Sequence, residues 1–251
     1  MASVKNIRLT SVLLAAALLV CLISACAIQT AQTADEPTKT PDTTPTSALT
    51  PTSMPENPSS QSTGVGDIIQ FGGHDWRVLE VQDNKALIIS DKILELLPYN
   101  VAYTDVTWET CKLRQYLNND FYNSFYSADR SRVVEATIIN DDNQWFGTRG
   151  GKDTTDRVFL LSLEELVKYF GDSGQLANYP GKIQYLHDKY NISRIAYNAA
   201  GVAWRWWLRS PGYGKHNPTY VFDDGRVNVY GYPATDDKCG VRPALWLKLE
   251  S

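Results

Sequence analysis

Tryptophan, tyrosine and arginine side chains that could bind a ligand are concentrated near the C-terminal end of this 251-residue sequence. The candidate binding residues are Trp204, Arg205, Trp206, Arg209, Tyr213, Asn228, Tyr230 and Tyr232. Exposed aromatic rings stack on sugar rings or peptide groups, and arginine and asparagine supply orienting hydrogen bonds. The alternative is core packing in which the arginines bond buried backbone. In a strand, Trp204 and Trp206 face one side and Trp207 the other, so at least one tryptophan must fill the core.

Two cysteines, Cys111 and Cys239, allow three alternatives: a reactive pair, a disulfide or two unpaired thiols. Cys111 falls on the apolar face of a predicted helix, where a thiol behaves as a small hydrophobe. Cys239 follows Asp236 and Asp237, whose carboxylates disfavour a thiolate. A disulfide is permitted outside the cytoplasm. The sequence favours unpaired, unreactive thiols.

Metal and cofactor chemistry has little support in the sequence. His74, His187 and His216 lie far apart and have no metal-ligand spacing around them. Residues 140–143 and 223–225 carry carboxylates but lack the spacing of a helix-loop-helix calcium site. We therefore predict no metal and no cofactor, with a solvated turn at 140–143 and a hairpin turn at 223–225.

The N-terminal segment has the layout of a bacterial secretory signal. Basic residues precede an uncharged apolar run over residues 9–23, and about 15 residues rise only ~22 Å as a helix, short of a ~30 Å bilayer core. Ser24 and Ala25 directly before Cys26 resemble the lipobox of bacterial lipoproteins, in which the cysteine receives a diacylglycerol. We predict a signal peptide at 1–25 and a lipid anchor at Cys26 that holds the protein on the extracytoplasmic face of the membrane.

The composition changes between residues 26 and 64, which we predict to be a disordered linker. Thr, Pro, Ser and Ala dominate, no aromatic residue occurs, and the segment holds half of the 12 prolines. Such a stretch cannot bury enough apolar surface to offset its ordering entropy. Cleavage after residue 25 removes two basic residues and no acid, so the formal net charge falls from −4 to −6. This acidic balance argues against nucleic-acid binding.

Residues 65–251 have the size of one globular domain, and their pattern predicts an α+β fold. Amphipathic spacing predicts a helix over 107–125, and a second helix starting at Ser127 that places Val133, Val134 and Ile138 on one face. Ser162 and Glu165 form a capping box for a helix that ends at Gly171. Period-two and turn patterns predict strands at 67–71, 76–81, 86–90, 204–209, 219–222, 226–230 and 241–249.

Three strings carry a family resemblance: WWLRSPG at 206–212, DGRV at 224–227 and GVRPALWL at 240–247. They resemble a domain of unknown function, number 6273, and the likeness extends over residues 65–249. This resemblance implies a secreted or surface protein of Gram-positive bacteria. More distantly, the pattern is similar to formylglycine-generating enzymes and C-type lectins, which implies a C-type-lectin-like, sulfatase-modifying-factor-like fold. Because formylglycine-generating enzymes use a copper-binding cysteine pair, the resemblance also keeps the reactive-cysteine alternative open.

These observations predict a cell-surface lipoprotein that presents a non-catalytic binding module on a flexible tether. Its ligand would be a glycan, a cell-wall component or a peptide. Two alternatives stay open: an enzyme of the formylglycine-generating or cell-wall-acting type, and a purely structural surface domain.

Overall fold

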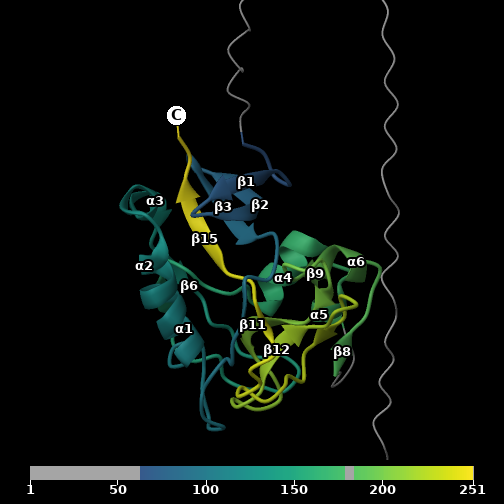
Figure 1. Ribbon diagram of the computed structural model, residues 1–251. Coiled ribbons are helices and arrows are strands. Elements are labelled where there is room, and N and C mark those ends of the chain that lie inside the picture. The colour runs from purple at the N-terminus through teal and green to yellow at the C-terminus, as the bar shows by residue number, and fades with distance from the viewer. Residues whose placement is uncertain (1–62, 179–183, 251) are drawn as a thin grey trace, which may run out of the picture. The chain divides into compact units, whose positions relative to one another are not determined.

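Two β-sheets with short helices around them organise the chain in the computed structural model, which describes residues 63–178 and 184–250 (Figure 1). The predicted signal peptide at 1–25, the lipidation site at Cys26 and all but the end of the predicted linker lie outside the described residues. The described residues lie within one compact unit and mix short helices with a larger number of strands, which agrees with the α+β prediction. None of the described helices is long and apolar enough to cross a membrane.

The first sheet, sheet A, has five strands in the order β1-β2-β3-β15-β5. Their bounds are Ile68–Phe71, His74–Gln82, Lys85–Ser90, Ala244–Lys248 and Val133–Val134. Strand β15, near the C-terminal end, lies between β3 and β5, so it joins the two ends of the domain in one sheet; Figure 1 shows it beside β3. Asp83 and Asn84, with φ of 50° and 59°, make the turn between β2 and β3, where the sequence predicts a hairpin between the strands at 76–81 and 86–90.

The second sheet, sheet B, has six strands in the order β4-β14-β11-β12-β13-β8. Their bounds are Glu95–Leu96, Gly240–Val241, Trp206–Pro211, Pro218–Val221, Val227–Asn228 and Tyr185–Leu186. The central strand β11 is buried along its whole length, which requires cover on both faces of the sheet. The predicted tight turn between β12 and β13 is present, with Gly225 at φ +80°. A Cβ at Gly225 would lie 1.8 Å from the carbonyl oxygen of Asn191, so only glycine fits this turn.

Helix α4, Leu163–Phe170, has the boundaries that its sequence signals predict. The Ser162 hydroxyl accepts a hydrogen bond from the Glu165 amide, and the Glu165 carboxylate accepts one from the Ser162 amide. Gly171, with φ of 113°, follows the last turn. The apolar face of α4 is buried, as a capping box followed by periodic apolar residues predicts.

Two other helix predictions need correction. The predicted helix over 107–125 begins only at Lys112 and consists of three short pieces: α1 (Lys112–Tyr116), a π-helical turn (Leu117–Phe121) and α2 (Tyr122–Ser124). The helix that starts at Ser127, α3, ends at Arg132. Val133 and Val134 instead form strand β5, because they pair with β15 at the edge of sheet A. Backbone pairing with a distant strand therefore prevails over the local helical spacing.

The remaining elements are short. They are β6 (Ala136–Ile138), β7 (Thr154–Asp156), α5 (Gln175–Asn178), α6 (Asn191–Arg194), β9 (Ala196–Tyr197) and β10 (Ala203–Trp204). A single cluster of buried side chains includes residues of both sheets and of α4. Four tryptophans are among its largest fully buried members: Trp76, Trp108, Trp206 and Trp207.

Candidate functional site

The eight predicted binding residues do not converge on one face; they divide into three groups. Trp206, Arg209 and Asn228 are buried. Tyr213 and Tyr230 form a separate stacked pair. Trp204, Arg205 and Tyr232 lie on or beside a partly exposed row of aromatic rings.

Trp206 belongs to the core and not to an exposed platform. Its indole is fully buried, and its Nε1 donates a hydrogen bond of 3.1 Å to the carbonyl oxygen of Arg194. Trp207 is also fully buried on the other face of the strand, where Nε1 donates to the Leu97 carbonyl oxygen at 2.9 Å. Sheet B is covered on both faces at β11, so both rings fill the core, which agrees with the prediction that at least one tryptophan does so.

Arg209 and Asn228 hold loops and strands together. The Arg209 guanidinium is paired with the Glu165 carboxylate, and it donates to the carbonyl oxygens of Leu160 at 2.8 Å and Ile139 at 2.9 Å. The Asn228 side chain accepts from the Gly231 amide at 2.9 Å. Neither side chain has exposed donors to offer a ligand, which removes both from the predicted site.

Residues 140–143 are also structural, and the sequence prediction of a solvated turn needs correction there. Asn143 is buried, and its side-chain amide donates to the carbonyl oxygens of Pro211 at 2.9 Å and Val229 at 3.1 Å. This residue therefore ties the loop to the ends of two sheet B strands. The described residues contain no cluster of three or more His, Cys, Asp or Glu that could hold a metal ion.

Tyr213 and Tyr230 stack face to face, with ring centroids 4.7 Å apart and planes 4° from parallel. Phe146 packs edge-on against both rings. The stacked face of each ring is covered by its partner, so this pair offers less ring surface to a ligand than two separate tyrosines would.

A row of four rings, which we call the aromatic strip, runs along sheet B and consists of Tyr185, Phe222, Tyr220 and Tyr232. Neighbouring centroids are 5.6, 4.8 and 5.9 Å apart along this order. Tyr185 and Tyr232 are exposed, Phe222 is half-buried and Tyr220 is buried beneath them. Sequence reasoning missed Tyr185 and Phe222. The i, i+2 spacing of Tyr220 and Phe222 indicates that both side chains lie on the same face of a strand. The position of Tyr185 beside them depends on the pairing of β8 with β13, which the local sequence does not indicate.

Charged groups flank the aromatic strip. The Arg226 guanidinium lies 5.1 Å from the Phe222 ring centroid, and the Arg205 guanidinium lies 5.8 Å from that of Tyr232. Arg205 is held by an ion pair of 2.8 Å with Asp236. Cation–π contacts of this kind fix the orientation of the guanidinium and leave its edge available for hydrogen bonds.

A recess of about 240 Å³ opens beside the strip and is lined by Trp204, Arg205, Tyr220, Phe222 and Asp223. The Trp204 indole is oriented by a hydrogen bond of 2.7 Å from its Nε1 to the Lys238 carbonyl oxygen. Asp223 is exposed and forms no ion pair within the described residues. Burial raises the pKa of Tyr220 to about 12, so its hydroxyl is protonated and neutral at physiological pH. The recess thus combines aromatic surface with a carboxylate and a guanidinium.

Cys111 and Cys239 are buried and form no disulfide within the described residues, which agrees with the favoured alternative. Cys111 caps helix α1, where its sulfur accepts a hydrogen bond of 3.3 Å from the Arg114 amide. Burial raises the pKa of the Cys111 thiol to about 12 and that of Cys239 well above its ordinary value. Because the thiolate is the nucleophile and the metal ligand, neither residue is set up as a reactive cysteine.

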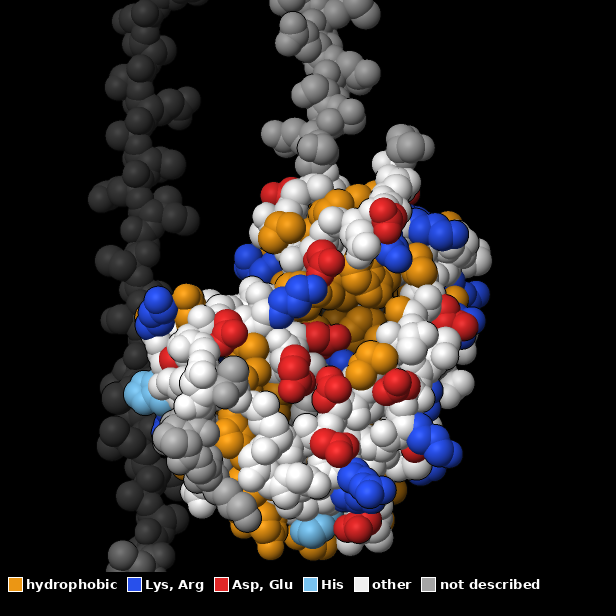
Figure 2. Space-filling model, turned by 180° about the vertical axis from the view of Figure 1, so that it is seen from behind, with side chains coloured by type: hydrophobic (Ala, Val, Ile, Leu, Met, Phe, Trp, Pro, Cys, Tyr) orange, Lys and Arg blue, Asp and Glu red, His pale blue; other side chains and the backbone are white. Residues whose placement is uncertain are grey.

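Basic side chains are scattered among acidic ones on the face shown in Figure 2, and do not gather into one patch. Single-sign basic patches are the electrostatic footprint of nucleic-acid binding. The same face shows hydrophobic side chains at the bottom of a hollow.

Comparison with known proteins gives one match. A family model described as "Domain of unknown function (DUF6273)" matches residues 83–249. This confirms the resemblance that the three C-terminal strings carry, while β1 and the whole of β2 lie before the matched region. No curated protein and no solved structure matches the chain.

Proposed function

Because the chain belongs to the DUF6273 family, whose description assigns no chemistry, we propose from its geometry that it is a non-catalytic glycan-binding module of a surface lipoprotein. The observation that carries this proposal is the aromatic strip with the recess beside it. A glycan from the cell wall or from a neighbouring cell is the ligand class that this combination suits best.

The physical argument is one of complementarity. Sugar rings present apolar C–H faces that pack on aromatic rings, and hydroxyl edges that need donors and acceptors. The strip supplies the exposed rings of Tyr185 and Tyr232, and the recess supplies Asp223 and Arg205. Trp204 and Arg205 keep their roles from the sequence prediction, while Phe222 and Tyr185 join them.

We further propose that the domain has a C-type-lectin-like, sulfatase-modifying-factor-like topology. The mixture of helices and strands, and the pairing of the C-terminal strand β15 with β3 of the N-terminal hairpin, are compatible with it. Fold likeness of this kind suggests an ancestry and does not assign a ligand.

The lipid anchor at Cys26 is part of the same proposal. Two acyl chains contribute roughly 0.8 kcal/mol for each buried methylene, which is enough for stable attachment. Mass spectrometry of the native product should find Cys26 as the first residue, with a mass increase that matches a diacylglycerol. An unmodified N-terminus, or recovery of the chain from the cytosol, would contradict the anchor.

Removing one ring from the strip or from the recess beside it should weaken glycan binding by up to about tenfold, since an aromatic contact contributes about 0.5–1.5 kcal/mol. The variants are Phe222→Ala and Trp204→Ala. Binding of the mature chain to peptidoglycan fragments and to a panel of host-type glycans would be followed by tryptophan fluorescence, with calorimetry for Trp204→Ala.

The matched control is Tyr126→Ala, which removes an isolated tyrosine that is 83% exposed on the loop before α3. This control should bind the glycan as the unchanged chain does. Equal affinity of all three variants would remove the strip from the site, and no binding to any glycan would favour the purely structural alternative.

A further inference from the structure

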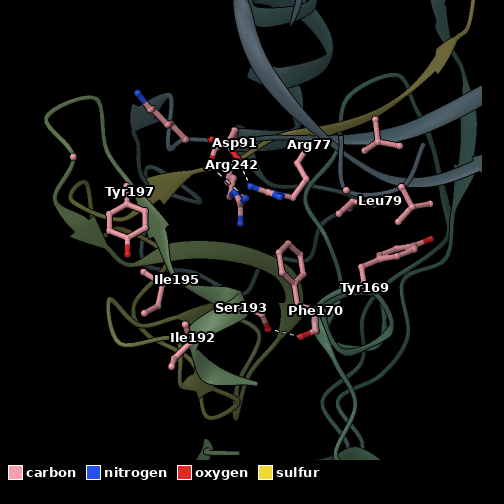
Figure 3. A pocket seen from close by; sticks show the side chains of 15 residues that line it. Arg77, Leu79, Asp91, Tyr169, Phe170, Ile192, Ser193, Ile195, Tyr197 and Arg242 are labelled. Carbon is pink, nitrogen blue, oxygen red and sulfur yellow. Dashed lines mark hydrogen bonds and ion pairs between the residues drawn. The ribbon is translucent and has the colours of Figure 1, made fainter. Parts of the chain in front are cut away.

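A cavity of about 710 Å³, whose lining side chains are drawn in Figure 3, shares no lining residue with the aromatic strip or the recess beside it. It is bounded by β2 of sheet A, the end of α4, and the α6–β9 segment. Its lining residue Arg242 packs on the ring of Trp206, whereas Tyr220 of the strip packs against Trp207. Successive strand residues point to opposite faces, so the two sites are separate.

Arg242 contributes a buried guanidinium to this cavity, and one of its donors has no partner. The residue is 2% exposed. Its Nε donates to the Ser90 carbonyl oxygen at 2.8 Å and its Nη2 to that of Asp91 at 3.4 Å, while Nη1 is buried without a hydrogen-bond partner among the described residues. A charged donor left unsatisfied in the interior is costly, so such groups normally meet an acceptor.

The other two buried arginines, Arg194 and Arg209, also have a buried Nε without a hydrogen-bond partner among the described residues, but each has a carboxylate partner, which Arg242 lacks. Arg194 is paired with the Asp188 carboxylate through contacts of 2.9 and 3.0 Å. Arg209 is paired with Glu165. Arg242 instead lies over the rings of Phe170 and Trp206, at 5.4 and 5.1 Å, and forms no ion pair within the described part of the chain. The positive charge of Arg242 is therefore stabilised by cation–π contacts with the two rings, but no carboxylate neutralises it.

The cavity as a whole carries excess positive charge. Its charged lining residues are Arg77, Arg242, Lys92 and a single acid, Asp91. The Asp91 carboxylate is already bonded to Arg77 at 2.9 Å. Burial lowers the pKa of Arg242 to about 10, and Arg77 lowers it further while Asp91 opposes the change, so the guanidinium is still charged at neutral pH. Figure 3 shows the guanidinium groups of Arg77 and Arg242 near Asp91 within the cavity.

The rest of the lining is largely apolar. Leu79, Phe170, Ile192, Ile195 and the tyrosines Tyr169 and Tyr197 surround the space in front of the two arginines (Figure 3). Cavities of a few hundred Å³ with apolar walls and a few convergent polar groups are typical of small-molecule sites. A charge-assisted hydrogen bond in such surroundings is stronger than one in water.

We propose that this cavity binds a small organic oxyanion, whose negatively charged head accepts hydrogen bonds from Arg77 and Arg242 and whose apolar body packs on the surrounding hydrophobic side chains. A carboxylate and a phosphate monoester share this chemistry. The site is independent of the aromatic strip, so its existence does not rest on glycan binding.

The test uses benzoate and phenyl phosphate as probes, with benzamide as the uncharged analogue of benzoate. Calorimetric titration of the mature chain at low ionic strength should give saturable binding of at least one anion and at least tenfold weaker binding of benzamide. The tighter of the two anions identifies the preferred head group. The bound anion should also raise the thermal midpoint in a concentration-dependent manner.

Arg77→Gln should reduce anion affinity by about tenfold or more, because it removes one charge-assisted donor at the cavity. The Arg77 side chain is 41% exposed, so the Arg77→Gln variant is expected to fold. A substitution of the buried Arg242, such as Arg242→Lys, could instead prevent folding, so the test does not depend on it. The matched control is Arg157→Gln, which removes a 44% exposed arginine whose ion pair with Glu135 has a length of 2.7 Å.

Three results would overturn the proposal. The first is the absence of saturable binding of either anion to the unchanged chain. The second is equal binding of benzoate and benzamide. The third is equal anion affinity of the Arg77→Gln and Arg157→Gln variants. Loss of glycan binding in Phe222→Ala with anion binding retained would confirm that the two sites are separate.

Discussion

Replacing Arg209 by methionine should destabilise the domain by about 3–5 kcal/mol, the usual cost of removing one partner from a buried ion pair. The side chain of Arg209 is 3% exposed and is paired with Glu165, the residue that also completes the capping box of α4. The substitution would leave the carbonyl oxygens of Leu160 and Ile139 without their donors. One change therefore weakens the start of α4, the centre of β11 and the loop after β6 together.

Urea unfolding followed by circular dichroism would measure this loss as a shift of the midpoint. The control is Arg226→Met, in which the lost partner is Asp224 at the surface. Exposed pairs contribute at most about 1 kcal/mol, so this variant should unfold close to the unchanged chain. If both variants lose the same stability, Arg209 does not have the structural role assigned to it.

Trp206→Ala is expected to cost about 3–5 kcal/mol, as for other large-to-small changes at a tryptophan in the core. The ring packs against Phe170 of α4, lies under the Arg242 guanidinium and bonds the Arg194 carbonyl oxygen. Its removal leaves a cavity between sheet B and α4, and takes away one of the two aromatic faces that accommodate the unpaired charge of Arg242.

Trp204→Ala provides the comparison, since Trp204 is only half-buried. We expect it to change the free energy of unfolding by about 1–2 kcal/mol, and to act mainly on glycan binding. Thermal unfolding of both variants, beside glycan titration, separates the two roles. A Trp204→Ala chain as unstable as Trp206→Ala would show that the recess is part of the core.

The two proposed sites use the two faces of one strand. Trp206 and Trp207 are adjacent, and each supports a different surface: the oxyanion cavity behind Trp206 and the aromatic strip beside Trp207. Strand β11 is buried along its whole length, so it is packed on both of its faces. A change at one face is therefore expected to leave the other intact, provided that the strand itself is not disturbed.

Features that depend on a few neighbouring residues were predictable from the sequence. The turn at Asp83 and Asn84, the tight turn at Gly225 and the capping box of α4 follow from backbone preferences and hydrogen bonds within three or four residues. The α+β class follows from the order of these local patterns, and the family from strings that lie in and around the strands of sheet B and β15.

Features that depend on distant partners were decided only by the tertiary structure. Val133 and Val134 form a strand because their backbone pairs with the edge of β15. Tyr185 joins the aromatic strip because β8 pairs with β13. A sequence fixes the side to which a strand residue points, but the burial of that side depends on which distant segment covers it. For that reason the sequence indicates the Trp, Tyr and Arg residues as candidates for ligand binding. Only the fold determines that Arg209 joins α4, β11 and the loop after β6, and that Arg242 is a buried cation without a carboxylate partner.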